Sequence, residues 1–524
     1  MKYENLAGIF QIPFHRKKII SLVSICLTIA VCALSVIAYN TQTKTDTPKQ
    51  LIKQAEKLVR QGEFEKAERI LRVLIERDPL ESKAKLALSY IFLKQRRLLE
   101  AYDWSLAVAV AEPKNSYAFA VLGATLLNAG NFRDAKLAFY NSIKLDNRES
   151  LAWLGLGMLD FYENRITQGL ESLREAVYLE PREPDYLYSL AQVAARAEQY
   201  KEAAGAYRRF LQIAPQTDGE RRERIKGLIG FLEYLGNRQS LYTLSGAKQT
   251  VVPVRLVNDR PVIQIKLEKN GEPLNFVLDT GSGISVISEE TAQKMKIKPV
   301  TRGGLARGIG GDGKFEIIYG FLSAIHIGDV KIKNVPIYIR KFHTQSERID
   351  GYIGLSLISK FLTTLDYGTS TFTLIDRNPI EQKTVETKNL SLPLRLTSSG
   401  FLSGEVQLEG VPLPLNFIVD TGASVSVISD ALANTKEISP FVKAEKMRVV
   451  GAAGITENVS SFLLPRVSFG SHSRQSVTAI ALDLGLINET SGFEQAGILG
   501  GNFLKNYRLT FDFQNSRVVF VPIK

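Results

Sequence analysis

Two aspartates, Asp279 and Asp420, lie in nearly identical surroundings in different parts of the chain. Phe276–Ser288 reads FVLDTGSGISVIS and Phe417–Ser429 reads FIVDTGASVSVIS, so that eight of the 13 positions are identical. Two carboxyls held a few ångström apart cannot both ionise, and they share one proton. The ionised member can accept a proton from water while the protonated member donates one to a carbonyl oxygen. The duplication therefore predicts a site built from two carboxyls that share one proton and can activate water.

The chain around the two aspartates is duplicated more widely. Downstream of each aspartate, Ile353–Tyr367 aligns with Leu499–Phe513. Short runs of Val, Ile, Leu and Phe, separated by Gly, Asn and Pro, are typical of all-β structure. We therefore expect two homologous β units joined by a polar linker, with the units at residues 250–376 and 391–524 and the linker at 377–390.

This half of the chain resembles the aspartic peptidases. In each copy an Asp-Thr-Gly motif follows a hydrophobic strand, and a later hydrophobic-hydrophobic-Gly element, Tyr352–Gly354 or Ile498–Gly500, resembles the family's second loop. In length, each unit is similar to a retropepsin-like subunit and shorter than a pepsin lobe. The resemblance implies that Asp279 and Asp420 are the catalytic pair. Since one chain carries both copies, we expect it to close the site by itself.

Supporting roles are expected for the residues that follow each aspartate, Thr280, Gly281, Ser282, Thr421, Gly422 and Ala423. The resemblance implies that the two threonines hydrogen-bond across the interface and hold the loops rigid. The two glycines let the backbone approach the carboxyls and supply N–H donors without side-chain bulk. Ser282 can donate to the adjacent carboxylate whereas Ala423 cannot, so we expect the two halves to be electrostatically inequivalent.

Glycine-rich stretches lie at a similar distance past each aspartate, at Gly308, Gly310, Gly311, Gly313, Gly451 and Gly454. In retropepsin-like enzymes a hairpin flap in this place closes over the substrate and excludes water, and the resemblance implies the same role here. An ordinary hairpin turn is the alternative. Gly308–Gly313 also matches the G-x-G-x-x-G dinucleotide motif, which requires a following helix. The next residues, KFEIIYGFL, indicate a strand, which argues against nucleotide binding.

The first half of the chain has a 34-residue period. Small residues recur at that spacing, as do prolines with Asn147 in the vacant place: Ala67, Ala101, Ala135, Gly169 and Ala203, and Pro79, Pro113, Pro181 and Pro215. A small residue lets two helices approach closely, and a proline ends the second helix of each repeat. The pattern resembles a tetratricopeptide array of about five repeats plus a capping helix within residues 47–240. The resemblance implies a groove that binds a substrate or partner protein, and a spacer is the alternative.

Residues 19–39 form an uncharged, mostly apolar run. About 20 such residues are enough to span a bilayer as a helix. The preceding tail, residues 1–18, is basic, and basic residues tend to stay on the cytoplasmic side. We therefore expect a single-pass membrane protein with a cytoplasmic N-terminus and an extracytoplasmic bulk on the periplasmic or extracellular side. A signal peptide cleaved near Ala33–Ser35 is the alternative.

The net charge of +12 is distributed in a way that argues against nucleic-acid binding. Five basic residues and one acidic residue lie within the first 45 positions, and the remaining excess is dilute. Both cysteines, Cys26 and Cys32, fall in the predicted membrane span, and the four histidines are isolated from one another. We therefore expect no metal site and no cofactor.

The expected fold class is multidomain, with a transmembrane helix, an all-α tetratricopeptide solenoid and all-β pseudo-two-fold aspartic-peptidase barrels. The expected function is that of a membrane-anchored extracytoplasmic aspartic endopeptidase acting on a protein or peptide. A scaffold that binds peptides without cutting them is the alternative. Pairing of the two β units within one chain is simpler than pairing between chains, because the linker is short, and the oligomeric state stays open.

Overall fold

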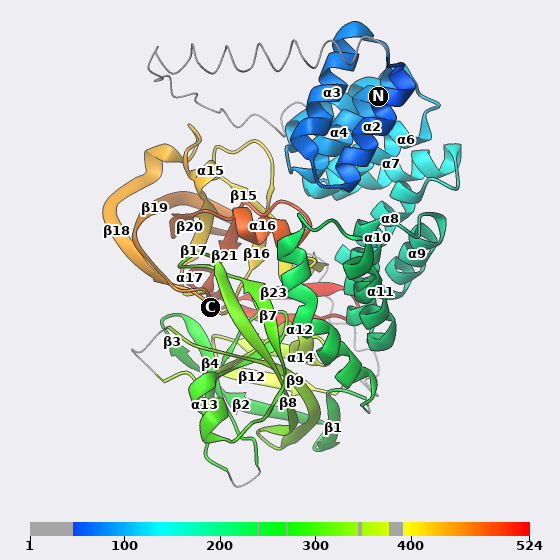
Figure 1. The fold of residues 1–524 in the computed structure, drawn as a ribbon. Coiled ribbons are helices and arrows are strands. Elements are labelled where there is room, and N and C mark those ends of the chain that lie inside the picture. Colours follow the sequence, from blue (N-terminus) through cyan, green and yellow to red (C-terminus); the bar gives the residue numbers. More distant parts are fainter. Residues whose placement is uncertain (1–45, 239, 269–270, 344–347, 377–390, 524) are drawn as a thin grey trace, which may run out of the picture. The chain divides into compact units, whose positions relative to one another are not determined.

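The computed structural model describes residues 46–238, 240–268, 271–343, 348–376 and 391–523. The chain divides into two compact units (Figure 1). The first runs to Gly155 and includes Ala214–Asp218, and the second comprises Leu156–Ile213 and Gly219–Lys524. The predicted tail (1–18), membrane span (19–39) and linker (377–390) lie outside the described residues. Within the described ranges, every helix is too short or too polar to cross a membrane.

Helical hairpins follow one another from Pro48 to Ile213. Their first helices are α2 (Pro48–Arg60), α4 (Ser82–Lys94), α6 (Ser116–Asn128), α8 (Ser150–Tyr162) and α10 (Pro184–Arg196). Their second helices are α3 (Phe64–Arg77), α5 (Leu98–Ala111), α7 (Phe132–Leu145), α9 (Ile166–Leu179) and α11 (Tyr200–Ile213), and α12 (Gly219–Gly236) follows them. The starts of the first helices are evenly spaced, with the same period that the sequence predicted.

The repeated small residues lie where the two helices of a hairpin touch. The four alanines of this series are fully buried. The fifth member, Gly169 in α9, shows why size matters: a Cβ on it would lie 2.7 Å from the carbonyl oxygen of Gly157 in α8. The repeated prolines come two residues after the ends of α3, α5, α9 and α11, where a ring without an N–H cannot continue a helix.

The chain after α12 is rich in strands. The first lobe contains β1 (Thr243–Gly246), β2 (Gln249–Pro253), β3 (Arg255–Val257), β4 (Arg260–Ile265), β5 (Leu274–Leu278), β6 (Ser285–Ser288), α13 (Glu289–Lys294), β7 (Pro299–Arg307), β8 (Lys314–Ile327), β9 (Val330–Arg340), β10 (Gly351–Ile353), α14 (Leu355–Ile358), β11 (Leu362–Asp366) and β12 (Thr371–Ile375). The second lobe contains β13 (Ser391–Pro393), β14 (Arg395–Leu396), β15 (Leu402–Leu408), β16 (Leu415–Val419), β17 (Ser426–Ser429), α15 (Asp430–Ala433), the 3-10 helix η3 (Ser439–Phe441), β18 (Val442–Val450), β19 (Ile455–Phe469), β20 (His472–Leu482), α16 (Gly485–Ser491), β21 (Gly497–Leu499), α17 (Gly501–Leu504), β22 (Tyr507–Asp512) and β23 (Arg517–Pro522).

The two lobes have matching strand orders. The sheet of the first lobe runs β3-β4-β5-β10-β6-β9-β8-β7, and that of the second runs β14-β15-β16-β21-β17-β20-β19-β18. In each lobe the strand that leads to the aspartate, β5 or β16, is parallel to the strand that leads to the second loop, β10 or β21. That strand in turn is antiparallel to β6 or β17. The duplication seen in the sequence is therefore also a duplication of topology.

A third sheet joins the two lobes within the one chain. Its order is β13-β23-β22-β11-β12-β2, with β11 and β22 antiparallel to each other. Thr364 of β11 pairs with Thr510 of β22, and their hydroxyls lie 3.0 Å apart. These two residues are equivalent in the internal alignment. Because equivalent residues meet, the pseudo-two-fold axis passes between them.

The last helix of the helical region, α12, packs directly on the first lobe. Figure 1 shows α12 beside β7. A Cβ on Gly227 of α12 would lie 2.4 Å from the carbonyl oxygen of Arg302 in β7, so the helix approaches the strand backbone closely. The ring of Phe231 lies 4.9 Å from that of Tyr319 in β8, and both side chains belong to the large core that the two lobes share. The end of the helical region is thus part of the same compact unit as the lobes.

Candidate active site

Asp279 and Asp420 occupy matching places in two loops that face each other. Each directly follows a central strand of its lobe, β5 or β16. The backbone N–H of each aspartate donates to a carbonyl of the second loop, Ile353 or Leu499, at 3.0 Å. The central position of these strands in their sheets holds both loops in place.

The two adjacent threonines bind the loops to each other by reciprocal hydrogen bonds. The N–H of Thr280 donates to the hydroxyl of Thr421 at 3.1 Å, and the N–H of Thr421 donates to the hydroxyl of Thr280 at 3.0 Å. Each hydroxyl then donates to a strand carbonyl of the other lobe, Val419 at 2.6 Å or Leu278 at 2.7 Å. Both threonines are buried, so these four bonds are shielded from water.

The two glycines of the motif lie against the opposite carboxyl. A Cβ on Gly281 would lie 2.4 Å from Cγ of Asp420, and a Cβ on Gly422 would lie 2.6 Å from Cγ of Asp279. Each glycine N–H donates to the aspartate of its own loop, at 2.9 Å for Gly281 and 2.7 Å for Gly422. Any side chain at either position would separate the carboxyls.

Burial raises the pKa of both carboxyls. Desolvation, followed by the nearby charge of Asp420, holds the pKa of Asp279 well above its usual range. Desolvation also raises the pKa of Asp420, but a hydrogen bond from Asp279 and the N–H groups of Gly422, Ala423 and Gly281 oppose that rise. The two carboxyls therefore share one proton, and its titration belongs to the pair and not to either aspartate alone.

The expectation that Ser282 donates to the adjacent carboxylate is wrong. Its hydroxyl donates instead to the carbonyl oxygen of Ile284, at 2.8 Å. A hydroxyl has one proton to donate, and the tight turn after Asp279 brings this carbonyl within reach. The two lobes are still inequivalent, because desolvation raises the pKa of Asp279 and the nearby charge of Arg340 opposes part of that rise.

The two glycine-rich stretches form the tips of the hairpins β7–β8 and β18–β19, and these tips touch. The N–H of Ala453 donates to the carbonyl of Ile309 at 2.9 Å. A Cβ on Gly451 would lie 2.0 Å from the same carbonyl oxygen, and one on Gly310 would lie 2.2 Å from the carbonyl oxygen of Gly454. Gly310 also has a φ of +90°, which disfavours other residues.

The other glycines of this group lie close by. Gly308 and Gly311 also face the opposite tip, whereas Gly313 packs on Leu486 of α16. The stretch Gly308–Gly313 joins two antiparallel strands instead of leading into a helix. It therefore lacks the strand–helix context of a dinucleotide-binding loop.

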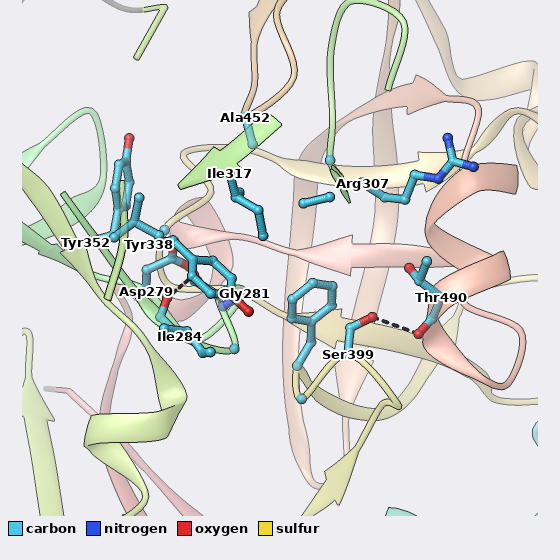
Figure 2. Close-up of a pocket in the computed structure, with 18 of the residues that line it drawn as sticks. Asp279, Gly281, Ile284, Arg307, Ile317, Tyr338, Tyr352, Ser399, Ala452 and Thr490 are labelled. Carbon is cyan, nitrogen blue, oxygen red and sulfur yellow. Dashed lines mark hydrogen bonds between the residues drawn. The ribbon is translucent and has the colours of Figure 1, made fainter. Parts of the chain in front are cut away.

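A cavity of about 830 Å³ surrounds the carboxyl pair. Both aspartate loops, both hairpin tips, α10 and α12 contribute to its lining. Figure 2 shows two hydrogen bonds among the lining residues, from the N–H of Gly281 to Asp279 at 2.9 Å and from the hydroxyl of Ser399 to the carbonyl of Thr490 at 2.7 Å. Tyr338 and Tyr352 also belong to this lining.

Sequence reasoning missed two groups of lining residues. The first is Arg340, at the end of β9, which donates to the carbonyl oxygen of Ala452 in the opposite hairpin tip at 3.2 Å. Strand pairing places Leu482 of β20 at the equivalent position of the second lobe, so a comparison of the two copies could have revealed this asymmetry. The second group comes from the helical region and includes Tyr188, Arg196 and Arg224. No sequence motif connects these helical residues to the aspartates.

Possible metal ligands are scattered in the part of the chain that the structure describes. There, no three His, Cys, Asp or Glu side chains gather closely enough to hold a metal ion. The carboxyl pair itself offers two ligands, but it lies beside backbone N–H donors, which repel a cation.

Family models match both halves of the chain. The aspartyl protease model matches residues 263–357 and 404–503, one segment around each aspartate. The tetratricopeptide repeat model matches residues 52–116 and 154–217. The BBSome complex member BBS4 homolog of Drosophila melanogaster is 26% identical over 153 residues, which are 29% of this chain and 32% of that protein. The match thus spans about a third of that relative's length.

Two solved structures are similar to part of the chain. A thermophilic tetratricopeptide protein of Thermus thermophilus is 17% identical and covers 36% of this chain and 100% of its own, with a TM-score of 0.31. PilF of Pseudomonas aeruginosa is also 17% identical and covers 36% of this chain and 86% of its own, with a TM-score of 0.28. The family matches and the topology show that this chain is a tetratricopeptide-repeat array followed by a duplicated aspartyl-protease-like region.

Proposed function

We propose that this protein is an aspartic endopeptidase with a single active site formed by Asp279 and Asp420. One observation carries the proposal. The two Asp-Thr-Gly loops, far apart in the sequence, meet through reciprocal threonine hydrogen bonds, and each carboxyl lies against the glycine of the other loop. This geometry keeps two carboxyls together that would repel each other if both were ionised.

The shared proton suits the pair to peptide-bond hydrolysis. The ionised member of the pair accepts a proton from a water whose oxygen bonds to the peptide carbonyl carbon. The protonated member donates its proton to the carbonyl oxygen, which leaves a tetrahedral diol and reverses the protonation of the pair. Transfer of the newly accepted proton to the amide nitrogen then breaks the C–N bond, while the other carboxyl recovers a proton from the diol. The products are a carboxylic acid and an amine.

The hairpin tips are suited to enclose the substrate. They meet tip to tip through the Ala453–Ile309 hydrogen bond and line the same cavity as the carboxyls. We propose that they act as flaps that separate to admit a peptide and then exclude water around it. Exclusion of water strengthens the electrostatic interactions of the pair with the developing charge.

The proposal extends to the rest of the chain. Tetratricopeptide repeats are protein-interaction modules, and the BBS4 homologue that resembles this region is by name a member of a protein complex. We propose that the array recruits the substrate or a partner protein. The uncharged run at 19–39 and the basic residues before it support a membrane anchor with the peptidase on the extracytoplasmic side.

Cleavage of an unfolded protein by the full-length chain, between about pH 3 and pH 8, tests the catalytic proposal. We expect Asp279→Asn and Asp420→Asn each to lower the rate at least about a hundredfold. Asp329→Asn, which changes an exposed aspartate in the turn between β8 and β9, is the matched control and should leave the rate unchanged. Cleavage that survives either active-site substitution would contradict the shared pair. Peptide binding without any cleavage would show a scaffold that does not cut.

The anchor has its own test. Alkaline carbonate extraction of membranes should leave the full-length chain in the membrane pellet. High pH removes proteins that are bound at the membrane surface, but it does not extract a helix that spans the hydrocarbon. Release of the intact chain, or a mature N-terminus that begins after the run at 19–39, would show that the chain is not anchored by this segment.

A further inference from the structure

The cavity around the carboxyl pair is strongly basic. Among the described residues, seven arginine or lysine side chains line it, against three carboxyls. Two of those carboxyls are Asp279 and Asp420, which share a proton. The third, Glu198, forms an ion pair with Lys360.

Two more of the basic side chains have carboxylate partners. Arg307 forms ion pairs with Glu220 of α12 and, at 3.3 Å, with Glu489 of α16. Arg448 lies 2.8 Å from Glu457. These pairs offset the charges of their arginines locally, so they do not account for the basic character of the cavity.

The remaining four, Arg196, Arg224, Arg260 and Arg340, are called here the cavity arginines. Within the described ranges, none of them forms an ion pair with a carboxylate. Arg340 donates to the backbone carbonyls of Lys341 and Ala452, each at 3.2 Å. Arg224 donates a hydrogen bond to the hydroxyl of Tyr188 at 3.4 Å, and Arg260 donates one to the carbonyl oxygen of Val257 at 3.4 Å. For Arg196 the described residues supply no hydrogen-bond acceptor.

Two of these arginines are held in surroundings that disfavour their charge. Desolvation lowers the pKa of Arg196 and of Arg340. The nearby carboxyls, Glu198 for Arg196 and Asp279 for Arg340, offset only part of this cost of burying a guanidinium. Arg196 nevertheless keeps part of its surface exposed, because it faces the cavity instead of packed protein. An anion that enters the cavity would remove this cost, and the planar fork of arginine suits a carboxylate best.

The cavity arginines come from separate parts of the fold. Arg196 ends α10 and Arg224 lies in α12, so they belong to the helical wall of the cavity. Arg340 ends β9 and lies close enough to Asp279 for its charge to oppose the rise in the pKa of that carboxyl that desolvation causes. An extended chain that passes the carboxyl pair would therefore meet basic side chains at more than one point.

We propose that the substrates of this peptidase are acidic polypeptide segments, whose carboxylates bind the cavity arginines. The proposal rests on the proposed function, because it assigns a substrate class to the same site. The carboxylates come either from Asp and Glu side chains or from a free C-terminus, and both bind a guanidinium in the same way. A positive cavity also raises the local concentration of acidic peptides and speeds their association.

Matched peptides test the preference. Each peptide is made with Glu or with Gln at one position after another around the scissile bond, and with a free or an amidated C-terminus. The full-length chain should cleave at least one acidic form with a kcat/KM about tenfold or more above that of its neutral partner. The position at which the difference appears, or its restriction to the free C-terminus, identifies the source of the carboxylate. A ratio near one at every position would overturn the proposal.

Variants then connect the preference to the arginines. Arg196→Gln and Arg224→Gln should lower the acidic-to-neutral ratio of kcat/KM, whereas Arg196→Lys should preserve part of it. Arg182→Gln, which changes an exposed arginine just before α10, is the matched control and should leave the ratio unchanged. Far-UV circular dichroism confirms that each variant folds. A ratio that neither glutamine variant alters would overturn the assignment of the cavity arginines.

A binding measurement tests the substrate class independently of whether the protein cuts peptides. Fluorescence anisotropy measures the affinity of the same peptides for the full-length Asp279→Asn variant, with and without Arg196→Gln. Tighter binding of the acidic peptide, reduced by Arg196→Gln, supports the substrate class even if the wild-type chain cuts nothing. Equal binding of acidic and neutral peptides overturns it even if both are cut. Tighter binding of a single-stranded oligonucleotide than of the acidic peptide also overturns it.

Discussion

Asp279 and Asp420 face each other because each neighbouring glycine leaves room for the opposite carboxyl. Burial raises the pKa of both carboxyls, and the nearby charge of Asp420 raises the pKa of Asp279 further. A site with these properties stores a proton at a pH where an exposed aspartate has lost its own. The stored proton has consequences for stability as well as for chemistry.

We expect the free energy of unfolding to fall as the pH rises above about 4, in part because of Asp279. The pKa of this carboxyl is raised in the folded chain, so the unfolded chain loses the proton first. The stability that the Asp279 carboxyl contributes is fully present at a pH below its pKa in the unfolded chain. This stability is lost as the pH rises through its pKa in the folded chain. For one proton the slope is at most about 1.4 kcal/mol per pH unit.

Thermal unfolding of Asp279→Asn measures this effect. The variant does not titrate, so its melting temperature should rise relative to wild type between about pH 3 and pH 7. Asp329→Asn, the exposed control, should differ from wild type by a constant amount. A constant difference for Asp279→Asn too would mean that the pKa of Asp279 is not raised in the folded chain.

The threonine pair gives a second prediction at the residue scale. Thr421→Val keeps the shape of the side chain but removes the acceptor of the Thr280 N–H and the donor to the Leu278 carbonyl. Since both groups are buried, we expect a loss of about 2 kcal/mol or more in urea unfolding, with a lower kcat. Thr421→Ser keeps the hydroxyl and should retain most of the stability. Equal losses for both variants would assign the effect to packing instead of hydrogen bonding.

At the scale of elements, α12 connects the helical region to the hairpin β7–β8. The contact combines the close approach of Gly227 to β7, the ring pair Phe231–Tyr319 and the ion pairs of Glu220 with Arg307 and Lys314. The equivalent strand of the second lobe, β18, is mostly exposed along its length. The two hairpins are therefore held unequally, and β7–β8 is the more firmly held of the two.

Two glycines of α12 form a matched pair for testing this contact. Gly227→Ala should destabilise the chain by about 1–3 kcal/mol, because its Cβ would meet the Arg302 carbonyl oxygen at 2.4 Å. Gly230→Ala places its Cβ 3.7 Å from the nearest Thr301 atom and should stabilise the helix by up to about 1 kcal/mol. Hydrogen exchange should show faster exchange in β7 only for Gly227→Ala. Similar behaviour of the two variants would show that α12 does not hold β7.

The sequence predicted α12 as the polar cap of the repeats but did not predict its contact with β7. Its run ERRERIKGLIGFLEYL carries helical spacing and charge, which are local properties. The apolar residues Phe231 and Leu235 could equally have packed on the preceding repeat. Their partners in the first lobe lie far along the chain, and no sequence pattern connects them.

At the scale of the whole molecule, the second compact unit contains more than the two lobes. It begins within α8 and includes α9 to α12 with the β-rich region. The cavity of the carboxyl pair has lining residues from both parts of this unit. A fragment that begins just after α12 would thus lack the part of the cavity lining that α10 and α12 supply.

Truncated chains test whether the helices of the second compact unit stabilise the two lobes. We expect residues 156–524 to unfold in a single transition, whereas residues 245–524 should be less stable by several kcal/mol and should exchange amide protons faster in β7 and β8. The shorter chain exposes Tyr319 and Phe321, which pack on Phe231 and Tyr234, and each large apolar side chain loses about 1.5–3 kcal/mol of burial. Equal stability of the two fragments would show that the helices contribute nothing to the lobes.

The sequence by itself determined what repeats along the chain. The regular period of the first half indicated the helical hairpins, and the duplicated Asp-Thr-Gly loops indicated two related lobes and a carboxyl pair, since repetition is visible without any knowledge of the fold. Only the tertiary structure decided which acceptor the Ser282 hydroxyl takes, that Arg340 reaches the opposite hairpin tip, and that α10 and α12 line the cavity. These contacts depend on where distant segments come to rest against each other, and single residues that meet only in three dimensions leave no periodic or duplicated pattern.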